Sequence, residues 1–277
     1  MKTWEETIKY IRTKPEYSNL VEKAYLNEDL VKNVESFRNS REFLETKKLL
    51  KSCNTPIKKL LDIGCGNGIS SISFALEGYD VTAVEPDGSS TVGAGAIRIL
   101  KNHYKLDNIT IFESYAEDIK FENETFDLVY FRQAMHHANE LEKFIAESAR
   151  VLKKNGLLLS IRDHVIFNEE DKKQFLKTHP LQEFYGGENA YTANEYEEAM
   201  AKSGLKIVKK IKTFDSVINY FPMDEKFIQK ILLKKRLAEI IISLTPSFIN
   251  EKIKLKIQNL LNEKDFDGRM YSYLCRK

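Results

Sequence analysis

The clearest chemical signal in the chain lies at residues 60–68, which have the sequence LLDIGCGNG. A short apolar run ends there in glycines, and a helical pattern follows over residues 69–76. Glycines at a strand-to-helix turn let the backbone approach a ligand closely and leave unpaired N–H groups at the start of the helix. We therefore expect a polar ligand above this turn.

The spacing of the glycines narrows the kind of ligand. Dinucleotide-binding dehydrogenases use G-x-G-x-x-G, and its third glycine would fall on Ile69 in this chain, so that pattern is excluded. The chain has D-x-G-x-G-x-G instead, with Asp62 directly before the turn. Because a carboxylate repels phosphate and attracts an amino group, Asp62 favours a ligand with an ammonium group over a pyrophosphate.

A second acid, Glu85, ends the next predicted strand about twenty residues after the first glycine. A carboxylate at this place can accept hydrogen bonds from both ribose hydroxyls. Ribose is common to dinucleotides and to other nucleoside cofactors, so Glu85 alone does not separate the two classes. Asp62 and the altered glycine spacing separate them better.

Ionisable residues follow two later predicted strands, over residues 126–131 and 157–161. They are His136, His137, Arg162, Asp163 and His164. Ligands of α/β proteins bind at the carboxyl ends of the strands, so we expect these side chains in the part of the site that would hold a substrate, the acceptor of a transferred group. His164 would act as the base and Arg162 would bind an anionic acceptor, with the others as further catalytic candidates. The alternatives are a histidine pair that shapes its loop and a salt-bridged surface turn.

Residues 163–191 form a long connection with a glycine pair, a combination typical of a lid over a site. Its polar and aromatic residues are candidates for contacts with the acceptor. They are Tyr185, Glu188, Asn189 and Tyr191. The alternative is an ordered loop that caps the next helix.

These candidates need a scaffold, and the hydrophobic pattern supplies one. Helices are predicted over residues 3–50, after which apolar runs alternate with helical patterns, as in a parallel sheet covered on both faces. The predicted strands are residues 59–63, 80–85, 109–112, 126–131, 157–161, 206–213 and 269–276, and the later helices are 89–103, 140–154 and 192–202. We therefore predict an α/β fold with a Rossmann-like, seven-stranded, mostly parallel sheet and helices on both faces.

The domain organisation follows from the same pattern. Residues 1–57 form an N-terminal helical cap, and residues 58–221 form the core with its lid. Residues 222–264 form a helical insertion and residues 265–277 the final core strand. The insertion carries Ile and Leu at helical spacing beside Lys234, Lys235 and Arg236, which suits a packed helix with solvated lysines or a contact with a membrane or lipid-linked substrate.

Composition limits the classes of partner. A formal net charge of +2 gives no electrostatic reason to expect a nucleic-acid partner. The start of the chain lacks the basic and apolar segments of a signal peptide, and no apolar run is long enough to span a membrane. Three widely spaced cysteines form no metal-ligand pattern and suit a reducing compartment. We expect a cytoplasmic protein without a bound metal.

The motifs together resemble the class I S-adenosylmethionine-dependent methyltransferases, in particular the small-molecule enzymes similar to methyltransferase type 11. The resemblance covers about residues 58–161 and continues more weakly to residue 205. Besides the glycine turn and Glu85, it rests on three segments. They are AED at residues 116–118, FDLVY at 126–130 leading into MHH at 135–137, and VLKKNGL at 151–157.

That resemblance implies S-adenosylmethionine as the cofactor and assigns roles to the motif residues. Asp62 and the backbone of the turn would hold the methionine moiety, Glu85 with Pro86 the ribose, and Ala116 with Glu117 the adenine. Gln133 would lie near the sulfonium or the amino group. The turn residues meant are Gly64, Cys65, Gly66 and Gly68. Many relatives have Asp where this chain has Tyr115, which puts the recognition of adenine in question.

The predicted function is methyl transfer from S-adenosylmethionine to a small molecule or glycan, with oxygen as the favoured acceptor atom. The glycan is suggested by a weak similarity of residues 179–191 to methyltransferases of bacterial surface-glycan clusters. One alternative is a nucleic-acid or protein methyltransferase, although RQAM stands at residues 132–135 where nucleic-acid enzymes carry an N-P-P-Y-type motif. A catalytically silent, methyltransferase-like binding subunit is another.

Overall fold

The computed structural model describes residues 1–223, 255, 258–259, 262 and 269–277. The predicted helical insertion over residues 222–264 lies almost entirely outside the described residues, as do residues 265–268 of the predicted final segment. In the described part of the chain, no helix is long and apolar enough to cross a membrane.

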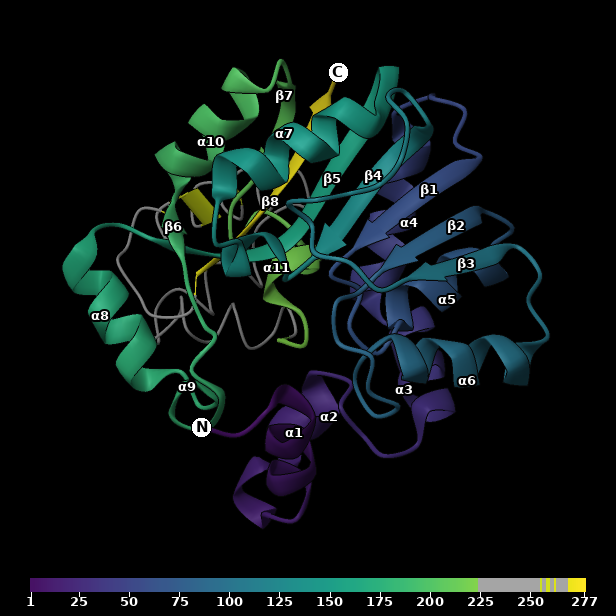
Figure 1. The fold of residues 1–277 in the computed structure, drawn as a ribbon. Coiled ribbons are helices and arrows are strands. Elements are labelled where there is room, and N and C mark those ends of the chain that lie inside the picture. The colour runs from purple at the N-terminus through teal and green to yellow at the C-terminus, as the bar shows by residue number, and fades with distance from the viewer. Residues whose placement is uncertain (224–254, 256–257, 260–261, 263–268) are drawn as a thin grey trace, which may run out of the picture.

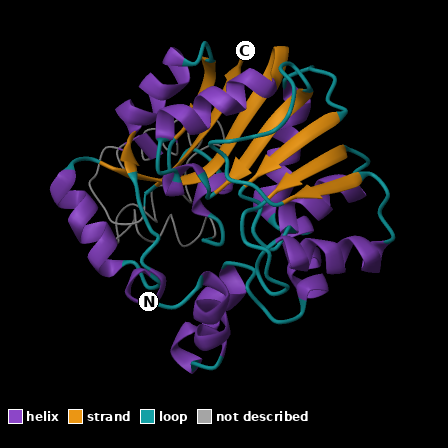
Figure 2. Cartoon of the chain, in the orientation of Figure 1, coloured by secondary structure: helices purple, strands orange, loops and turns teal. Residues whose placement is uncertain are grey.

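One twisted sheet forms the centre of the molecule (Figures 1 and 2). Its main path has the order β3-β2-β1-β4-β5-β8-β7, and the short β6 pairs with β5. The strands are β1 (Lys59–Ile63), β2 (Asp80–Val84), β3 (Ile109–Phe112), β4 (Phe126–Arg132), β5 (Leu152–Ile166), β6 (Tyr191–Thr192), β7 (Lys206–Ile211) and β8 (Met270–Arg276). The predicted α/β class is confirmed, and the seven-strand path gains only the two-residue β6.

The direction of the strands changes at one place. The pairs from β3 through β5 are parallel, whereas β8 runs antiparallel to both β5 and β7. The carboxyl ends of β1, β2 and β4 therefore lie at the same edge of the sheet. The strand order changes direction at β1, with β2 and β3 on one side of it and β4 and β5 on the other. Ligands of open α/β sheets bind at such an edge.

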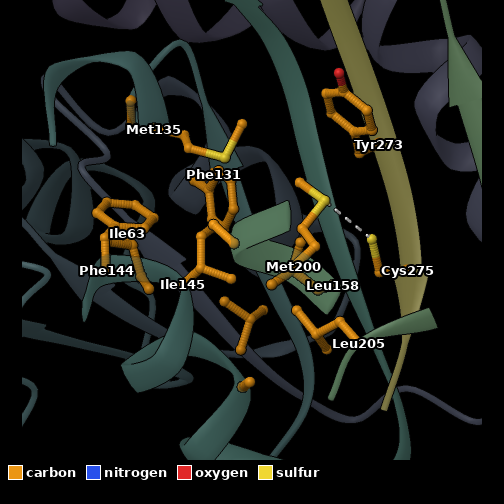
Figure 3. Packing of buried hydrophobic residues seen from close by; sticks show 14 of the residues in the cluster. Ile63, Phe131, Met135, Phe144, Ile145, Leu158, Met200, Leu205, Tyr273 and Cys275 are labelled. Atoms are coloured by element: carbon orange, nitrogen blue, oxygen red, sulfur yellow. Dashed lines mark hydrogen bonds between the residues drawn. The ribbon is translucent and has the colours of Figure 1, made fainter. Parts of the chain in front are cut away.

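Alternation along the strands supplies both faces of the core. Leu61 and Ile63 of β1 point into one hydrophobic cluster, and Leu60, which precedes them, points into the other. The first cluster lies under α7 (Leu141–Val151) and α10 (Ala193–Lys202). Figure 3 shows its packing, including the 3.6 Å contact between the sulfur atoms of Met200 and Cys275.

The second cluster is covered by helices on the opposite face of the sheet. They are α3 (Leu30–Arg38), α4 (Arg41–Ser52), α5 (Ile69–Leu76), α6 (Ala94–Tyr104) and α11 (Val217–Tyr220). The N-terminal region begins with α1 (Trp4–Arg12), the short η1 (Pro15–Tyr17) and α2 (Ser18–Lys23), which stand apart from the sheet in Figure 1. As the sequence predicts, the chain enters the sheet only after a set of helices.

Two local patterns match their predictions closely. The helix after the glycine turn, α5, covers residues 69–76. At the start of α10, the Thr192 side chain accepts from the Glu195 N–H while the Glu195 side chain accepts from the Thr192 N–H, which is the capping box expected there.

The fifth strand is longer than predicted, and this corrects the position of residues 162–164. The sequence indicates a strand over 157–161 with Arg162, Asp163 and His164 in the turn after it. In the structure β5 continues to Ile166 through a register shift between Ser160 and Asp163, because β8 pairs with it on both sides of the irregularity. Arg162 sits in the shift with φ +61°, and its N–H donates to Ser272 Oγ at 3.0 Å.

The predicted lid contains regular structure of its own. After residues 163–166, which belong to β5, it forms α8 (Glu169–Thr178) and α9 (Gln182–Tyr185) before it reaches β6. The end of α9 meets the N-terminus of the chain, since the Lys2 N–H donates to the Phe184 carbonyl at 2.9 Å. Two segments that are far apart in sequence therefore form one cover over the carboxyl edge of the sheet.

Candidate active site

A cavity of about 640 Å³ opens at this edge, within the range of small-molecule and cofactor sites. Its floor comes from the glycine turn and the ends of β2 and β4, and its cover from α1 and the end of α9. Of the predicted cofactor residues, the following line it: Gly64, Cys65, Gly66, Glu85, Pro86, Ala116, Glu117 and Gln133. Asp62 and Gly68 do not line the cavity.

The glycine turn brings backbone close to backbone. Gly64 has φ +61°, and a Cβ placed there would lie 2.8 Å from the Cβ of Ala134. Gly66 has φ +55° and faces more open space, since the nearest atom to its added Cβ would be the Val92 carbonyl at 3.7 Å. Glycine at position 64 lets the turn lie against the loop after β4, and the positive φ of both glycines directs the chain so that the N–H groups at the start of α5 can meet a ligand.

Glu85 closes the turn from the end of β2. Its Oε2 accepts from the Gly66 N–H at 2.7 Å, and its Oε1 accepts from the Asp87 N–H at 3.0 Å. Burial raises the pKa of Glu85 to about 7, although these two hydrogen bonds oppose the rise. The carboxylate lines the cavity with lone pairs left for further donors, as the hydroxyls of a ribose would be.

Asp62 is fully buried beneath the turn. Its Oδ2 accepts from the hydroxyls of Ser70 and Ser71, both at 2.6 Å, whereas its Oδ1 has no hydrogen-bond partner among the described residues. Burial raises the pKa of Asp62 to about 6, against the lowering effect of the two serines. An orphaned carboxylate oxygen beside a glycine turn fits a ligand that carries an amino group, so the residues present suit S-adenosylmethionine.

The other wall of the predicted cofactor site follows β3 and β4. Gln133 comes directly after β4 with φ +51°, a conformation that is uncommon for a residue with a side chain, and its N–H donates to the Ile161 carbonyl at 2.8 Å. Ala116 and Glu117 line the cavity with Tyr115, which is 66% exposed. Tyr115 therefore lies at the rim, at the place where the resemblance departs from its relatives.

Some residues of the site were not singled out in the sequence. Thr3, Trp4 and Leu26 line the cavity from the N-terminal helices, and Asn67 lines it from the glycine turn. The Asn67 side chain donates to the Tyr25 carbonyl at 2.8 Å, which ties the turn to the loop after α2. Only the general expectation of a helical cap pointed to these contacts, because single residues in a helix carry no sign of what they will face.

A buried ion pair joins the helical cap to the sheet. Glu42 of α4 accepts from Arg132 Nε at 2.5 Å and from Arg132 Nη2 at 3.1 Å, and Arg162 Nη1 lies 3.6 Å from Glu42 Oε2. Burial alone would raise the pKa of Glu42, but the two arginines hold it below its ordinary value. Arg162 also donates to the carbonyls of Ile218 and Phe221, so its guanidinium has protein partners and does not line the cavity.

The predicted catalytic histidines take three different positions. His137 lines the cavity and its Nδ1 lies 3.0 Å from the Gly187 carbonyl. His136 is buried behind it, with Nδ1 3.1 Å from Asp163 Oδ1. His164 is buried farther away against the ring of Phe175, with centroids 4.8 Å apart. Of the three, His137 is the one that lines the cavity, whereas sequence reasoning favoured His164.

Burial controls the charge of this cluster. It lowers the pKa of His136 and His164 well below the ordinary value, and the neighbouring histidines lower it further. Burial also raises the pKa of Asp163 to about 7, while hydrogen bonds from the Ser160 hydroxyl and the His136 N–H oppose the rise. The two buried imidazoles are therefore neutral near pH 7.

The predicted acceptor residues of the lid divide into two groups. Tyr185 lines the cavity and packs on Trp4 with ring centroids 5.2 Å apart, and Glu188 turns its side chain toward the histidines. Tyr191 donates to the Ala138 carbonyl at 2.6 Å and contacts Asn189. Neither Tyr191 nor Asn189 lines the cavity, so their contacts fasten the end of the lid to the loop after β4.

Comparison with known proteins gives this geometry a context. Residues 61–160 match the family model described as a methyltransferase domain. The chain is 30% identical over 112 residues to the ubiquinone biosynthesis O-methyltransferase of Pelagibacter ubique. The matched segment covers 39% of this chain and 44% of that protein. The chain spans about half the length of the curated relatives it matches.

Solved structures extend the likeness beyond the matched segment. The YcgJ protein of Bacillus subtilis is 16% identical with a TM-score of 0.53, covering 83% of this chain and 95% of that one. Geranyl diphosphate C-methyltransferase from Streptomyces coelicolor, solved with S-adenosyl-L-homocysteine, is 14% identical with a TM-score of 0.57, covering 89% and 82%. At these identities the likeness concerns the fold. Residues 61–160 therefore form a methyltransferase domain, and the strand order and glycine turn around it are similar to those of the class I S-adenosylmethionine-dependent methyltransferases.

Proposed function

We propose that the protein transfers a methyl group from S-adenosylmethionine to a hydroxyl oxygen of a small molecule or glycan. The observation that carries the proposal is the composition of the cavity. One continuous space joins the glycine turn and Glu85 to His137 and Tyr185 under the cover of Trp4. A cofactor and an acceptor side by side would need such a space.

The cofactor half supplies binding. Glu85 would accept from the ribose, and the orphaned oxygen of Asp62 would accept from the amino group of the methionine moiety. Ala116 and Glu117 would lie along the adenine, and Gln133 would lie near the sulfonium. When bound, S-adenosylmethionine supplies an electrophilic methyl group, so the protein mainly has to align the acceptor with it and exclude water.

The acceptor half supplies alignment and proton removal. Trp4 and Tyr185 cover part of the cavity from two segments of the chain. A hydroxyl acceptor must lose a proton, and His137 with His136 behind it is the ionisable group of this wall. The name of the Pelagibacter relative, an O-methyltransferase of ubiquinone biosynthesis, supports an oxygen acceptor of small size.

Titration calorimetry tests the cofactor half. The chain should bind S-adenosylmethionine and S-adenosylhomocysteine at micromolar concentration and should not bind NAD. Asp62→Ala and Glu85→Ala should each weaken binding about 100-fold, because each removes a buried charged hydrogen-bond acceptor. Asp107→Ala, at an exposed position, serves as the control, and thermal unfolding of every variant separates lost binding from lost folding. Unchanged affinity in both site variants would overturn the assignment of the cofactor site.

A transfer assay tests the acceptor half. With S-adenosylmethionine that carries a labelled methyl group, we expect label in a hydroxylated small molecule or glycan from a panel of acceptors. Transfer to protein or nucleic acid alone would overturn the acceptor class. Cofactor binding without transfer to any compound would favour a silent binding subunit.

A further inference from the structure

Four of the five histidines of the chain gather beside the cavity, although they come from distant positions in the sequence. The ring centroids of His136 and His137 are 4.0 Å apart, those of His136 and His164 4.9 Å, and those of His164 and His179 5.9 Å. The fifth, His103, is exposed on α6. A group of imidazoles at one place needs an explanation beyond packing, because their ring nitrogens must be satisfied.

At the centre of the group lies a carboxylate that lacks an obvious countercharge. The Glu188 side chain is 5% exposed, and its oxygens lie 3.8 Å from His136 Nε2, 4.0 Å from His137 Nε2 and 3.5 Å from His179 Nδ1. Among the described residues, these histidines are its ion-pair partners, and no lysine or arginine is within 4 Å. A buried carboxylate is costly without a positive charge beside it, and no lysine or arginine among the described residues provides one at this distance.

The outer hydrogen bonds of the two adjacent histidines fix where their lone pairs point. The Nδ1 of His137 faces the Gly187 carbonyl, which can only accept, so the ring proton lies on Nδ1. The Nδ1 of His136 faces the Asp163 carboxyl in the same way. Both Nε2 atoms then carry lone pairs, so they and the Glu188 oxygens that they face are all acceptors and a cation between them would satisfy both. A carboxylate or carbonyl behind a histidine is the support that metal-ligating histidines have in proteins.

We propose that His136 Nε2, His137 Nε2 and a carboxylate oxygen of Glu188 bind a divalent transition-metal ion of the Zn²⁺ class. The three ligand atoms lie within 4.8 Å of one another. Two imidazoles and one carboxylate are a ligand set for Zn²⁺ or Fe²⁺, whereas Mg²⁺ prefers oxygen ligands. His179 is a candidate for a fourth ligand, since its Nδ1 is buried without a hydrogen bond among the described residues.

Binding requires only a local adjustment. A tetrahedral ion with bonds of about 2.1 Å separates its ligand atoms by roughly 3.4 Å, so the distances between the three atoms must shorten by at most about 1.4 Å. Glu188 lies between the end of α9 and β6, next to Gly186 and Gly187, and a loop of this kind can make the shift. The ion would at the same time fasten the lid to the loop after β4.

The position of the site suggests its use, which rests on the proposed function. His137 and Gly187 line the cavity, so the open coordination positions of the ion face the acceptor. A metal-bound hydroxyl has a lowered pKa, so its proton leaves to solvent water, and His137, whose Nε2 binds the ion, does not act as the base. The acceptor oxygen then forms its bond to the methyl carbon while the carbon–sulfur bond breaks. The favoured acceptor is a hydroxyl with a neighbouring oxygen that chelates the ion, such as a catechol or a vicinal diol.

Metal binding by the apo-protein tests the site directly. The 277-residue chain without a histidine tag is treated with a chelator, dialysed and titrated with Zn²⁺, Co²⁺ and Mg²⁺. We expect one Zn²⁺ per chain, no measurable Mg²⁺, and a Co²⁺ complex whose visible absorption is that of a four- or five-coordinate site. Zn²⁺ should also displace Co²⁺ and remove that absorption.

Variants locate the ion. Glu188→Gln and His137→Ala should each weaken Zn²⁺ binding at least 100-fold, and Asp163→Asn should weaken it about 10- to 100-fold because Asp163 orients His136 from behind. His103→Ala is the matched control and should bind as the parent does. Binding at full stoichiometry in both Glu188→Gln and His137→Ala would overturn the site.

The same protein separates this proposal from the proposed function. If S-adenosylmethionine binds and methyl transfer proceeds at full rate in the presence of chelator, with no Zn²⁺ bound to the chain, the metal site is wrong and the transfer reaction stands. If Zn²⁺ binds as expected but no acceptor is methylated, the metal site stands and the proposed function fails.

Discussion

The two halves of the cavity are built by different means. The cofactor half consists of strand ends and a glycine turn, and its main contacts, such as Glu85 to Gly66, join neighbouring strands of one sheet. The acceptor half consists of side chains from the N-terminus, the loop after β4 and the lid, which meet only in the folded chain. The first half is backbone geometry that a short sequence can encode, and the second is an assembly of distant parts.

This difference suggests that the halves fail in different ways. Damage to the cofactor half should remove binding while the sheet stands, because Glu85 lies at its edge. Damage to the contacts between the N-terminal helices and the end of β4 should instead lower the stability of the fold. Three experiments test the contrast, beginning with the largest expected effect.

A buried ion pair between Glu42 and Arg132 connects the N-terminal helices to the sheet. Glu42→Ala would leave a buried guanidinium without its counterion, which costs about 3 to 5 kcal/mol. We expect the free energy of unfolding to fall by that amount in urea titrations. Glu45→Ala, on the exposed side of the same helix, should change it by less than about 0.5 kcal/mol. Equal losses in the two variants would contradict the role of the pair.

In the cofactor half, the burial of Glu85 should make the free energy of unfolding depend on pH. The folded-state pKa of Glu85 is about 7 against an ordinary value of 4.5, so the folded chain binds the extra proton between these values. The stability contributed by that proton is present at pH 4.5 and is lost as the pH rises toward 7. Relative to Glu85→Gln, the parent chain should therefore lose about 2 to 3 kcal/mol between pH 5 and pH 7.

Urea titrations of both proteins without cofactor at the two pH values measure this difference. The comparison cancels the histidines, which titrate in both chains and work in the opposite direction. Parallel profiles would mean that Glu85 is solvated in the free protein.

The smallest effect is expected at the cover. Trp4→Ala removes one ring of the pair with Tyr185, and such a pair contributes about 1 kcal/mol. We expect S-adenosylhomocysteine to dissociate about five times faster in stopped-flow measurements, while the unfolding midpoint moves little. Trp4→Phe keeps an aromatic ring and should restore most of the slow dissociation. A fall in stability without a change in dissociation would give Trp4 a structural role only.

Sequence reasoning was accurate where structure is local. The strand, glycine turn and helix over residues 59–76 form as predicted, since the apolar run and the glycines encode them within a few residues. The same holds for the capping box at Thr192. Much of the cofactor half therefore follows from a short stretch of chain and one acid at the end of the next strand.

The acceptor half resisted prediction for a physical reason. A glutamate in an amphipathic helix normally faces water, and no sequence pattern near Glu42 predicts that it is buried against Arg132. The pairing of β5 with β8 extends the fifth strand through residues 162–164, and this pairing depends on residues more than a hundred positions away. The contacts of Glu188 with His179 and with the histidine pair also form only in the folded chain, so the sequence does not predict them.

The placement of β8 also governs the order in which the protein can be completed on the ribosome. This strand lies between β5 and β7, yet it is synthesised after the other strands that the structure describes. Until residue 276 has emerged, β5 keeps an open edge and β7 lacks its sheet partner, while β1 to β4 and the glycine turn are already available. The nascent chain can therefore form its cofactor half first, and the late strand closes an edge that would otherwise invite pairing with another chain.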